Sequence, residues 1–189
     1  DASAGTGART VLIEGLDGSY NAISETVTLN GQTAVNTTNT YLRVQHITVV
    51  TAGSGGVNAG TIYVGTGTVA SGIPATIYWQ SETSYNNWSF AGFTVPAGYT
   101  AYLTSCTWTS GNTTANILVT GGLFSRVLGG VFTLESSCKM TAGNNFDRHF
   151  DTALRFAEKT DIEMRAASST DLTISPLLLL RFLVSAIAS

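Results

Sequence analysis

Charged side chains are the scarcest group in this sequence. They make up 11% of the 189 residues, whereas a typical soluble domain carries about 25%. The chain holds 9 Lys and Arg against 12 Asp and Glu, which gives a formal net charge of -3. Recognition of nucleic acids needs a basic surface that neutralises phosphates. We therefore expect no nucleic-acid partner.

Cysteine is also rare, and no apolar run is long. The two cysteines, Cys106 and Cys138, are too few to frame a small disulfide-rich protein. They could bridge each other or remain free buried thiols, and the sequence leaves both alternatives open. The most apolar run, residues 177–188, contains Arg181 and is shorter than the roughly 20 residues of a membrane-spanning helix. We expect a terminal strand buried on both faces there, and no membrane partner.

Small polar residues and glycine take the place of the missing charges. The sequence contains 29 Thr, 18 Ser, 11 Asn and 20 Gly, together with 43% hydrophobic residues. A mean hydropathy of +0.19 argues against global disorder, and a chain of this length can bury a core without a metal or disulfide scaffold. Threonine suits a half-exposed sheet, because it is β-branched and carries a hydroxyl. The composition therefore favours β-structure.

Apolar and polar residues alternate along most of the chain, and turn-forming residues interrupt the alternation. Asp17-Gly18 is the strongest hairpin signal, Asn30-Gly31 is a second candidate for a two-residue type I′ turn, and Pro96-Ala97-Gly98 predicts a further turn. Strands are predicted over residues 10–15, 22–29, 41–51, 61–64, 75–80, 90–95, 99–109, 115–120, 131–134, 150–157, 162–166 and 172–187.

One segment, residues 153–165, is rich in good helix formers. We favour two strands there, because residues 158–161 have the composition of a turn. About a dozen short strands at regular spacing predict an all-β fold, an antiparallel jelly-roll-like sandwich. No linker-like composition divides the chain, so we predict a flexible N-terminal arm over residues 1–8 and a single domain over residues 9–189.

Charge is distributed unevenly along the chain. Between residues 44 and 134 only Glu82 and Arg126 are charged, whereas residues 135–171 carry twelve charged side chains. The uncharged stretch is either solvated by hydroxyls and amides or covered by another chain, since interface cores are poor in charge and rich in aromatic residues. The alternative, for at least half of the aromatic residues there, is the protein's own core. The candidate interface residues are Tyr78, Trp79, Tyr85, Trp88 and Phe90.

No group of residues in the sequence assembles a catalytic site. His46 lies inside an apolar strand, which predicts a packed, hydrogen-bonded core or face residue. Residues 65–70 formally match a dinucleotide-binding fingerprint, but Gly72 and Pro74 prevent the helix that such a site requires. We therefore expect no cofactor.

Asp147, His149 and Asp151 are the best candidate for a metal site. At this spacing in a strand the three side chains point to one face and would offer two carboxylates and an imidazole. The alternative is a solvated sheet edge, where free carboxylates discourage stray strand pairing. We favour the edge and expect no metal.

A third functional class, an enzyme that cleaves polysaccharides, needs two carboxylates placed across a groove. Glu82 is isolated in the sequence, whereas Glu158, Asp161 and Glu163 fit a charged turn better. We therefore expect a protein that is not an enzyme. One further carboxylate, Glu25, is the exception on the apolar face of its strand.

Four segments of the chain resemble virion structural proteins of tailed bacteriophages, especially marine ones. They are residues 10–31 (TVLIEGLDGSYNAISETVTLNG), residues 44–60, which end in TAGSGGVNAG, residues 95–105 (VPAGYTAYLTS) and residues 156–166 (FAEKTDIEMRA). Together they cover about a third of the chain. The resemblance implies a non-enzymatic component of the particle, present in many copies, and it carries over no catalytic residues.

We therefore expect a capsid decoration or cement protein that bridges neighbouring capsid subunits. Its partners would be other copies of itself in a trimer, and the major capsid protein or other virion proteins on the outer surface or tail of the particle. Residues 1–8 and 172–187 could each add a strand to a neighbour's sheet. The alternative is a tail, fibre or knob component that contacts the host, because aromatic and Asn-rich loops suit stacking against sugars.

Overall fold

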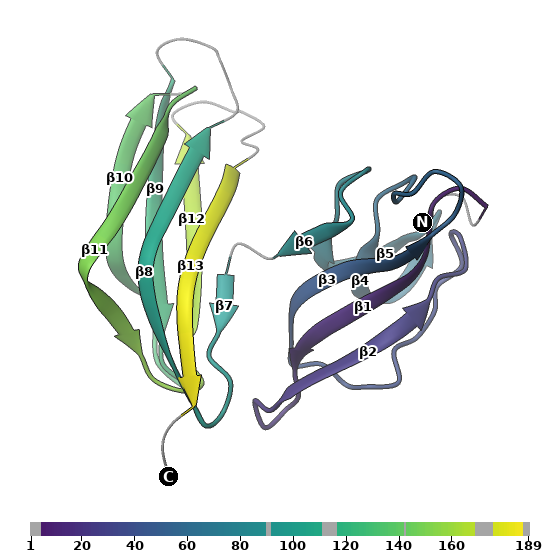
Figure 1. Cartoon of the computed structure of the whole chain (residues 1–189), viewed down its shortest axis with the longest axis horizontal. Coiled ribbons are helices and arrows are strands. Elements are labelled where there is room, and N and C mark those ends of the chain that lie inside the picture. The colour runs from purple at the N-terminus through teal and green to yellow at the C-terminus, as the bar shows by residue number, and fades with distance from the viewer. Residues whose placement is uncertain (1–4, 90–91, 111–116, 142, 169–175, 187–189) are drawn as a thin grey trace. The chain divides into compact units, whose positions relative to one another are not determined.

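The computed structural model describes residues 5–89, 92–110, 117–141, 143–168 and 176–186. These residues form antiparallel β-sheets, and no helix occurs among them (Figure 1). The all-β prediction is confirmed, whereas the jelly-roll topology stays a prediction. The chain divides into two compact units, Asp1–Phe90 and Ala91–Ser189.

Each unit has a hydrophobic core of its own. The sequence predicts one domain over residues 9–189, because no Pro-, Gly- or Ser-rich linker interrupts it. The boundary at residues 90 and 91 lies between the short strands β6 and β7. In the sequence, this stretch has the pattern of β-structure on both sides of the boundary. Composition does not mark it, and only the long-range pairing of strands separates the units.

The first unit contains a four-stranded sheet of order β2-β1-β3-β6 and a separate two-stranded hairpin. Both are antiparallel throughout. The sheet strands are β1 (Ala8–Leu16), β2 (Ala22–Thr28), β3 (Arg43–Ala52) and β6 (Asn87–Ser89), and the hairpin strands are β4 (Tyr63–Ala70) and β5 (Ile73–Gln80). The core of this unit consists of Ala8, Val11, Ile13, Val27, Ile47, Ile62 and Trp79.

The first hairpin lies where the sequence places it, but its turn is longer than expected. Leu16 pairs with Ala22, so the loop spans residues 17–21 instead of two residues. The Asp17 carboxylate explains the difference, because Oδ1 accepts hydrogen bonds from the backbone N–H groups of Ser19 at 2.8 Å and Asn21 at 2.9 Å. The same hydrogen bonds, with one from the Asn21 side chain, lower the pKa of Asp17.

The predicted N-terminal arm lies partly outside the described residues. Within the described part, the carbonyl of Gly7 accepts a hydrogen bond from Gly53 N at 2.7 Å, and that of Thr6 accepts one from Gly55 N at 3.1 Å. Ala8 opens β1 and is buried. The ordered unit therefore begins before residue 9, because a Gly-rich turn supplies backbone donors to the chain that enters it.

The second unit is built from two sheets, of order β10-β9-β12-β7 and β11-β8-β13. The side chains between the sheets form one core with Trp108, which is 1% exposed, near its middle. This unit is therefore a β-sandwich. Its strands are β7 (Gly92–Thr94), β8 (Tyr99–Ser110), β9 (Leu118–Arg126), β10 (Thr133–Thr141), β11 (Asn145–Phe156), β12 (Asp161–Ser168) and β13 (Pro176–Ala186).

Several turns and strands of the second unit confirm the sequence predictions. The ambiguous segment, residues 153–165, forms the end of β11, a turn and the start of β12, with Lys159 at a φ of 60°. The turn at Pro96–Gly98 closes with a hydrogen bond from Tyr99 N to Pro96 O at 3.3 Å. The terminal strand is β13, which pairs with β8, while its side chains lie outside the described part of the structure.

Strand β9 continues beyond the point at which the sequence predicts its end. The predicted strand covers residues 115–120, whereas β9 runs to Arg126 and includes Gly121 and Gly122, a residue type that normally weakens a strand. A Cβ on Gly121 would lie 2.5 Å from Trp108 Cδ1 and 2.8 Å from Cys138 Sγ. Glycine is required at position 121 because the indole of Trp108 occupies the space that a side chain would fill. Packing between the two sheets therefore explains why β9 contains a glycine.

Candidate functional site

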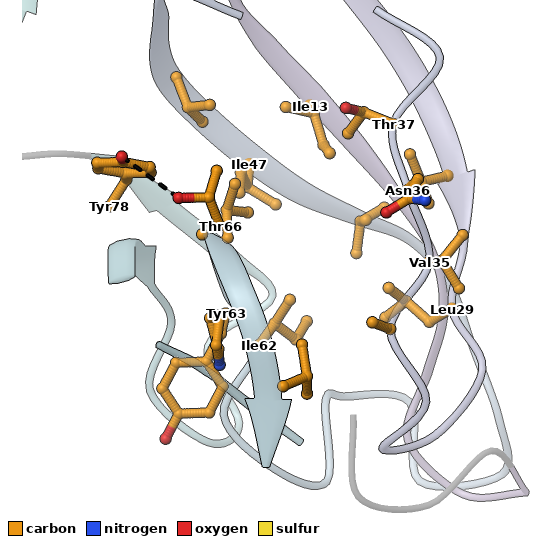
Figure 2. Close-up of a pocket in the computed structure, with 18 of the residues that line it drawn as sticks. Ile13, Leu29, Val35, Asn36, Thr37, Ile47, Ile62, Tyr63, Thr66 and Tyr78 are labelled. Atoms are coloured by element: carbon orange, nitrogen blue, oxygen red, sulfur yellow. Dashed lines mark hydrogen bonds between the residues drawn. The ribbon is translucent and has the colours of Figure 1, made fainter. Parts of the chain in front are cut away.

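The first unit contains a cavity of about 730 Å³ between its sheet, its hairpin and the loop over residues 30–40 (Figure 2). This volume is in the range of about 300–1,000 Å³ that ligand pockets occupy. Its apolar lining includes buried side chains of the core: Val11, Ile13, Val27, Ile47 and Ile62.

Two walls of the cavity carry polar groups without charge. Figure 2 shows Asn36 and Thr37 on the loop side, and Thr66 and Tyr78 on the hairpin side. The Thr66 hydroxyl donates a hydrogen bond to Tyr78 Oη at 3.4 Å. None of the described residues that line the cavity is Asp, Glu, Lys, Arg or His. The cavity therefore suits an uncharged, largely apolar occupant.

Glu25, the charged exception on the apolar face of β2, anchors the loop wall. Its Oε2 accepts a hydrogen bond from Thr38 N at 2.9 Å, and its Oε1 accepts one from Asn39 N at 3.2 Å. Asn39 Nδ2 in turn donates to Ser24 O at 3.2 Å. The carboxylate is thus satisfied by backbone donors, and the loop is tied to the edge strand of the sheet.

Tyr41 holds the same, C-terminal end of this loop. Its hydroxyl donates a hydrogen bond to Ile13 O at 3.3 Å. Burial raises the pKa of Tyr41, so the phenol stays protonated and remains a donor. The C-terminal end of the loop wall is therefore fixed by Glu25 and by Tyr41.

The opposite wall, the β4–β5 hairpin, is held by glycine and a tight turn. Ser71 and Gly72 have φ values of 50° and 80°, which is the pattern of a two-residue type I′ turn. A Cβ on Gly65 would lie 2.0 Å from Thr76 O, so only glycine lets the two strands approach there. The hairpin exposes the large apolar side chains of Val69, Ile73, Ile77 and Tyr78.

The structure separates the candidate interface residues into three groups. Tyr78 is 64% exposed and Tyr85 is 57% exposed, whereas Trp79 is 5% exposed and packs in the core. The backbone of Trp88 lies in β6 opposite Ile47. The Trp88 side chain and the whole of Phe90 lie outside the described part of the chain. Among the candidates whose side chains the structure describes, Tyr78 and Tyr85 are therefore the exposed rings.

The loop that carries Tyr85 is organised by Asn58, which sequence reasoning missed. Asn58 is fully buried, and its Nδ2 donates hydrogen bonds to Glu82 O at 2.7 Å and Gly60 O at 2.9 Å. Its backbone carbonyl accepts one from Ser84 N at 3.1 Å. An Asn in a Gly-rich loop is typical of this local role. The Tyr85 loop is thus anchored to the turn before β4.

An exposed apolar hairpin tip in the second unit was also missed. The tip, residues 127–131, joins β9 to β10, and the sequence predicts a strand over part of it. Val127, Leu128 and Val131 are 61%, 59% and 80% exposed. The available signal was an uncharged VLGGV segment with paired glycines between two strands.

The acidic residues of the second unit have structural partners. Asp161 forms an ion pair with Arg126, whose Nε lies 3.2 Å from Asp161 Oδ2, and Glu163 contacts Arg165. Glu158 accepts a hydrogen bond from Gly98 N at 2.6 Å. Asp161 thus links β12 to β9 and Glu158 links two turns, whereas Glu163 contacts Arg165 of its own strand.

Two guanidinium groups flank one aromatic ring on the same sheet. The Cζ atoms of Arg126 and Arg165 lie 4.5 Å and 4.4 Å from the centre of the Phe132 ring. Arg165 also lies 4.6 Å from the centre of the Phe124 ring. These cation–π contacts fix the base of the β9–β10 hairpin.

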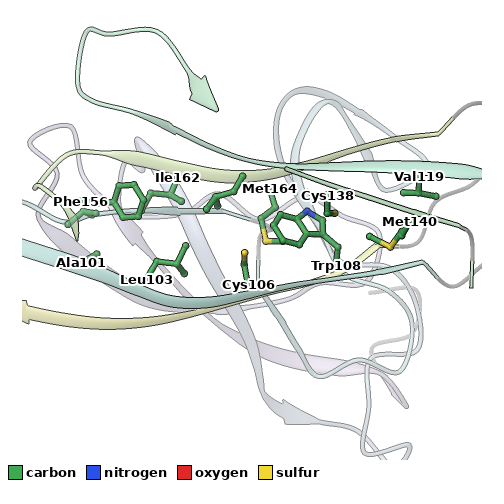
Figure 3. Close-up of a cluster of buried hydrophobic side chains, with 12 residues drawn as sticks. Ala101, Leu103, Cys106, Trp108, Val119, Cys138, Met140, Phe156, Ile162 and Met164 are labelled. Carbon is green, nitrogen blue, oxygen red and sulfur yellow. The ribbon is translucent and has the colours of Figure 1, made fainter. Parts of the chain in front are cut away.

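Both cysteines are free and buried in the core of the second unit (Figure 3). Burial, reinforced by the neighbouring Cys138, raises the pKa of Cys106 to about 12. Burial also raises the pKa of Cys138. Only a thiolate attacks a disulfide or an electrophile. Of the two alternatives from the sequence, the structure contains the pair of free, unreactive thiols.

The two histidines belong to different units. His46 is partly buried in β3 with Nε2 at 3.0 Å from Thr48 Oγ1, as the sequence predicts. Asp147, which accepts a hydrogen bond from Thr107 Oγ1 at 2.7 Å, and His149 are exposed, and the register of β11 shifts after His149. Within the described ranges, no three His, Cys, Asp or Glu residues gather closely enough to hold a metal ion.

Comparisons of this chain with protein-family models, with curated proteins and with solved structures found no match. The resemblance to structural proteins of tailed phages therefore stays a prediction. Among the described residues there is no helix of the length and hydropathy needed to cross a membrane.

Proposed function

We propose that this chain is a non-enzymatic structural protein of a tailed-phage particle, and that it decorates or cements the capsid by binding across neighbouring capsid subunits. The observation that carries the proposal is the exposed apolar surface of the β4–β5 hairpin. Its side chains lie in the long stretch with almost no charge. Interface cores have this composition, because burying a charge costs free energy.

In the proposed function, the free energy of binding to the capsid is the sum of several weak contacts. A two-stranded hairpin with exposed apolar residues on its surface offers a small contact area. In a trimer, the same contact repeats on each copy, and the second and third contacts form at a high effective concentration. The assembly then binds tightly although each contact is weak.

Particles stripped of this protein test the proposal. Purified chain added back should bind them and should raise the temperature at which packaged DNA is released. Tyr78→Asp should reduce binding by about tenfold or more, as expected for an aromatic contact residue. Tyr99→Asp changes an exposed tyrosine of the second unit and should bind normally. An unchanged temperature of DNA release with and without the wild-type protein would refute the cementing role.

The second candidate function is contact with the host surface as a tail, fibre or knob component. The exposed rings of Tyr78 and Tyr85 favour it, because sugars stack on exposed aromatic faces. Binding on a glycan array that is lost in Tyr85→Ala, together with labelling of the tail rather than the shell, would support this alternative. No binding on the array and a label on the shell would exclude it.

A further inference from the structure

The cavity of the first unit has an apolar side and a polar side. Its loop side is polar, because seven of the lining residues at positions 30–40 are Asn, Gln or Thr. Its sheet side is aliphatic and consists of Val11 and Ile13 of β1, Val27 of β2, and Val44 and Ile47 of β3. The lining therefore offers hydrocarbon contacts on one side and hydroxyl and amide groups on the other.

Each side of the lining restricts the ligand in a different way. A pure hydrocarbon would cover the amide and hydroxyl groups without giving them hydrogen bonds, and burying such groups unpaired costs free energy. A sugar without an apolar part would leave the aliphatic side in contact with water. A charged ligand would find no opposite charge, since none of the described lining residues is charged. A ligand that satisfies the whole lining is thus both uncharged and amphipathic.

The shape of the cavity favours a small molecule over the surface of a folded protein. Sheet, hairpin and loop bound it, and the loop meets the hairpin turn, where a Cβ on Gly72 would lie 3.3 Å from Gln32 Cβ. Glu25 ties the C-terminal end of the loop to β2. The walls are therefore in place before a ligand enters, which lowers the entropic cost of binding.

Polar groups on two walls can hold a hydroxylated head group. Asn36 on the loop wall has a side-chain amide that both donates and accepts, and no hydrogen bond within the described part of the chain uses this amide. On the hairpin wall, Tyr78 Oη accepts the hydrogen bond from Thr66, so its own proton is left to donate to a ligand. The Tyr78 ring is also exposed, and sugars stack on exposed aromatic faces.

We propose that the cavity binds a neutral amphiphile, with an aliphatic chain against the sheet and a sugar-like head group at the polar groups of the loop and the hairpin. This inference goes beyond the proposed function, because a protein that cements a capsid needs no small ligand. Such a site discriminates ligands by charge and by chain length.

A series of alkyl probes tests the proposal by calorimetric titration of the full chain. Octyl glucoside, kept below its critical micelle concentration, should bind saturably. Octanoate and octyltrimethylammonium carry the same chain on a charged head and should bind at least about tenfold more weakly, because the lining does not compensate a charge. Hexyl glucoside should bind about sixteenfold more weakly than octyl glucoside, since burial of each CH₂ group is worth about a factor of four.

Two pairs of variants locate the binding. Val35→Asp places a charge on the loop wall, and its control is Val50→Asp, at an exposed valine of β3 that does not line the cavity. Asn36→Leu removes a wall amide, and its control is Asn145→Leu, at an exposed asparagine of β11. Each wall variant should weaken binding of octyl glucoside by about tenfold. Both controls should bind like the wild type, and circular dichroism should show the same β-sheet content in all five proteins.

Three results would overturn the proposal. The first is the absence of saturable binding of octyl glucoside, and the second is equal binding of the three octyl probes. The third is an affinity for octyl glucoside that Val35→Asp and Asn36→Leu leave unchanged, because the ligand would then lie on another apolar surface.

Binding of the probes and binding of stripped particles are separate measurements. A chain that binds octyl glucoside but not particles would remove the proposed function and keep this site, and the reverse result would remove only the site. If no probe binds and Val35→Asp instead abolishes binding to particles, the cavity takes a protein partner and the present inference fails.

Discussion

The two units are both built from antiparallel sheets, but their interiors are filled differently. In the second unit a four-stranded and a three-stranded sheet enclose a continuous core around Trp108 (Figure 3). In the first unit a four-stranded sheet faces a hairpin of only two strands, and a cavity remains beside the core. In the second unit, the three-stranded sheet covers the core of the four-stranded sheet. In the first unit, the hairpin has only two strands, so part of the interior remains an open cavity.

The two units also differ in how they use charged side chains. In the second unit, Arg126, Arg165 and their acidic partners brace one sheet through ion pairs and cation–π contacts. In the first unit, the hairpin exposes apolar side chains, and its cavity has an uncharged lining. Among the described residues, the ion pairs and cation–π contacts therefore lie in the second unit, and the uncharged cavity lies in the first.

The largest expected effect is the loss of Trp108. Trp108→Ala should destabilise the second unit by about 3–5 kcal/mol, because two packed sheets cannot collapse into the space left behind. Trp79→Ala should cost less, since its neighbours border an open cavity and can rearrange more freely. Urea unfolding followed by circular dichroism measures both. Equal losses in the two variants would contradict the difference in packing between the units.

Gly121→Ala tests the tight packing of the same core. The new Cβ would overlap the indole of Trp108 and the sulfur of Cys138, and overpacking of this kind costs about 1–3 kcal/mol. Gly18→Ala is the matched control, because nothing lies within 4 Å of its Cβ position. The control should change the unfolding free energy by less than about 0.5 kcal/mol. A normal stability for Gly121→Ala would show that the second unit is looser than the structure implies.

Asp161→Asn tests the charge network of the second unit. Asp161 is paired with Arg126 and accepts a hydrogen bond from Thr94 Oγ1 at 2.7 Å. Removal of its charge should cost about 1.5–2 kcal/mol, since hydrogen bonds to charged groups are stronger than neutral ones. Thermal unfolding at low and high salt is the measurement. If Asp161→Asn is as stable as the wild type at both salt concentrations, the charge network does not stabilise this sheet.

Glu25→Gln tests the loop wall of the cavity in the first unit. Weaker hydrogen bonds to Thr38 N and Asn39 N should cost about 1 kcal/mol. Hydrogen exchange at these two amides should accelerate, while amides of the second unit should not change. Glu14→Gln, an exposed residue of β1, is the control. Equal exchange rates in both variants would remove Glu25 as the anchor of the loop.

Titration of Cys106 gives the smallest effect, because it changes the unfolding free energy only above about pH 9. Its folded pKa of about 12 lies above the ordinary 9.0 of a thiol, so the folded state holds the proton more tightly than the unfolded state. This contribution to stability is complete below about pH 9 and is lost as pH rises toward 12. Cys106→Ala should unfold less steeply with rising pH above about 9. Identical pH profiles for the two proteins would contradict the shift.

Local signals predicted much of the strand pattern. The alternation in residues 22–29 and the turn at residues 158–161 were correct, because each depends on neighbours in the sequence. The prediction for the first hairpin placed it correctly but gave it the wrong turn, since the Asp17 carboxylate captures the N–H groups of Ser19 and Asn21. The end of β9 was wrong because the reason for Gly121 lies on another strand, at Trp108.

The candidate site was less predictable than the fold. The sequence singled out five aromatic residues of one stretch, and of these the structure exposes Tyr78 and buries its neighbour Trp79. Alternation in a strand places such neighbours on opposite faces, but the sequence does not state which face is covered. The cavity and the tip were not predicted, because each depends on how far a distant layer extends.

The sequence by itself determined the β-class of this protein, the positions of most strands and the shortage of charge over its middle, since these depend on residue type and on spacing of two along the chain. Tertiary structure alone decided the division into two units, the open cavity of one and the closed core of the other. Those features depend on which strands pair and which sheets face each other. Pairing over long separations is chosen by the whole set of contacts, and no local pattern records it.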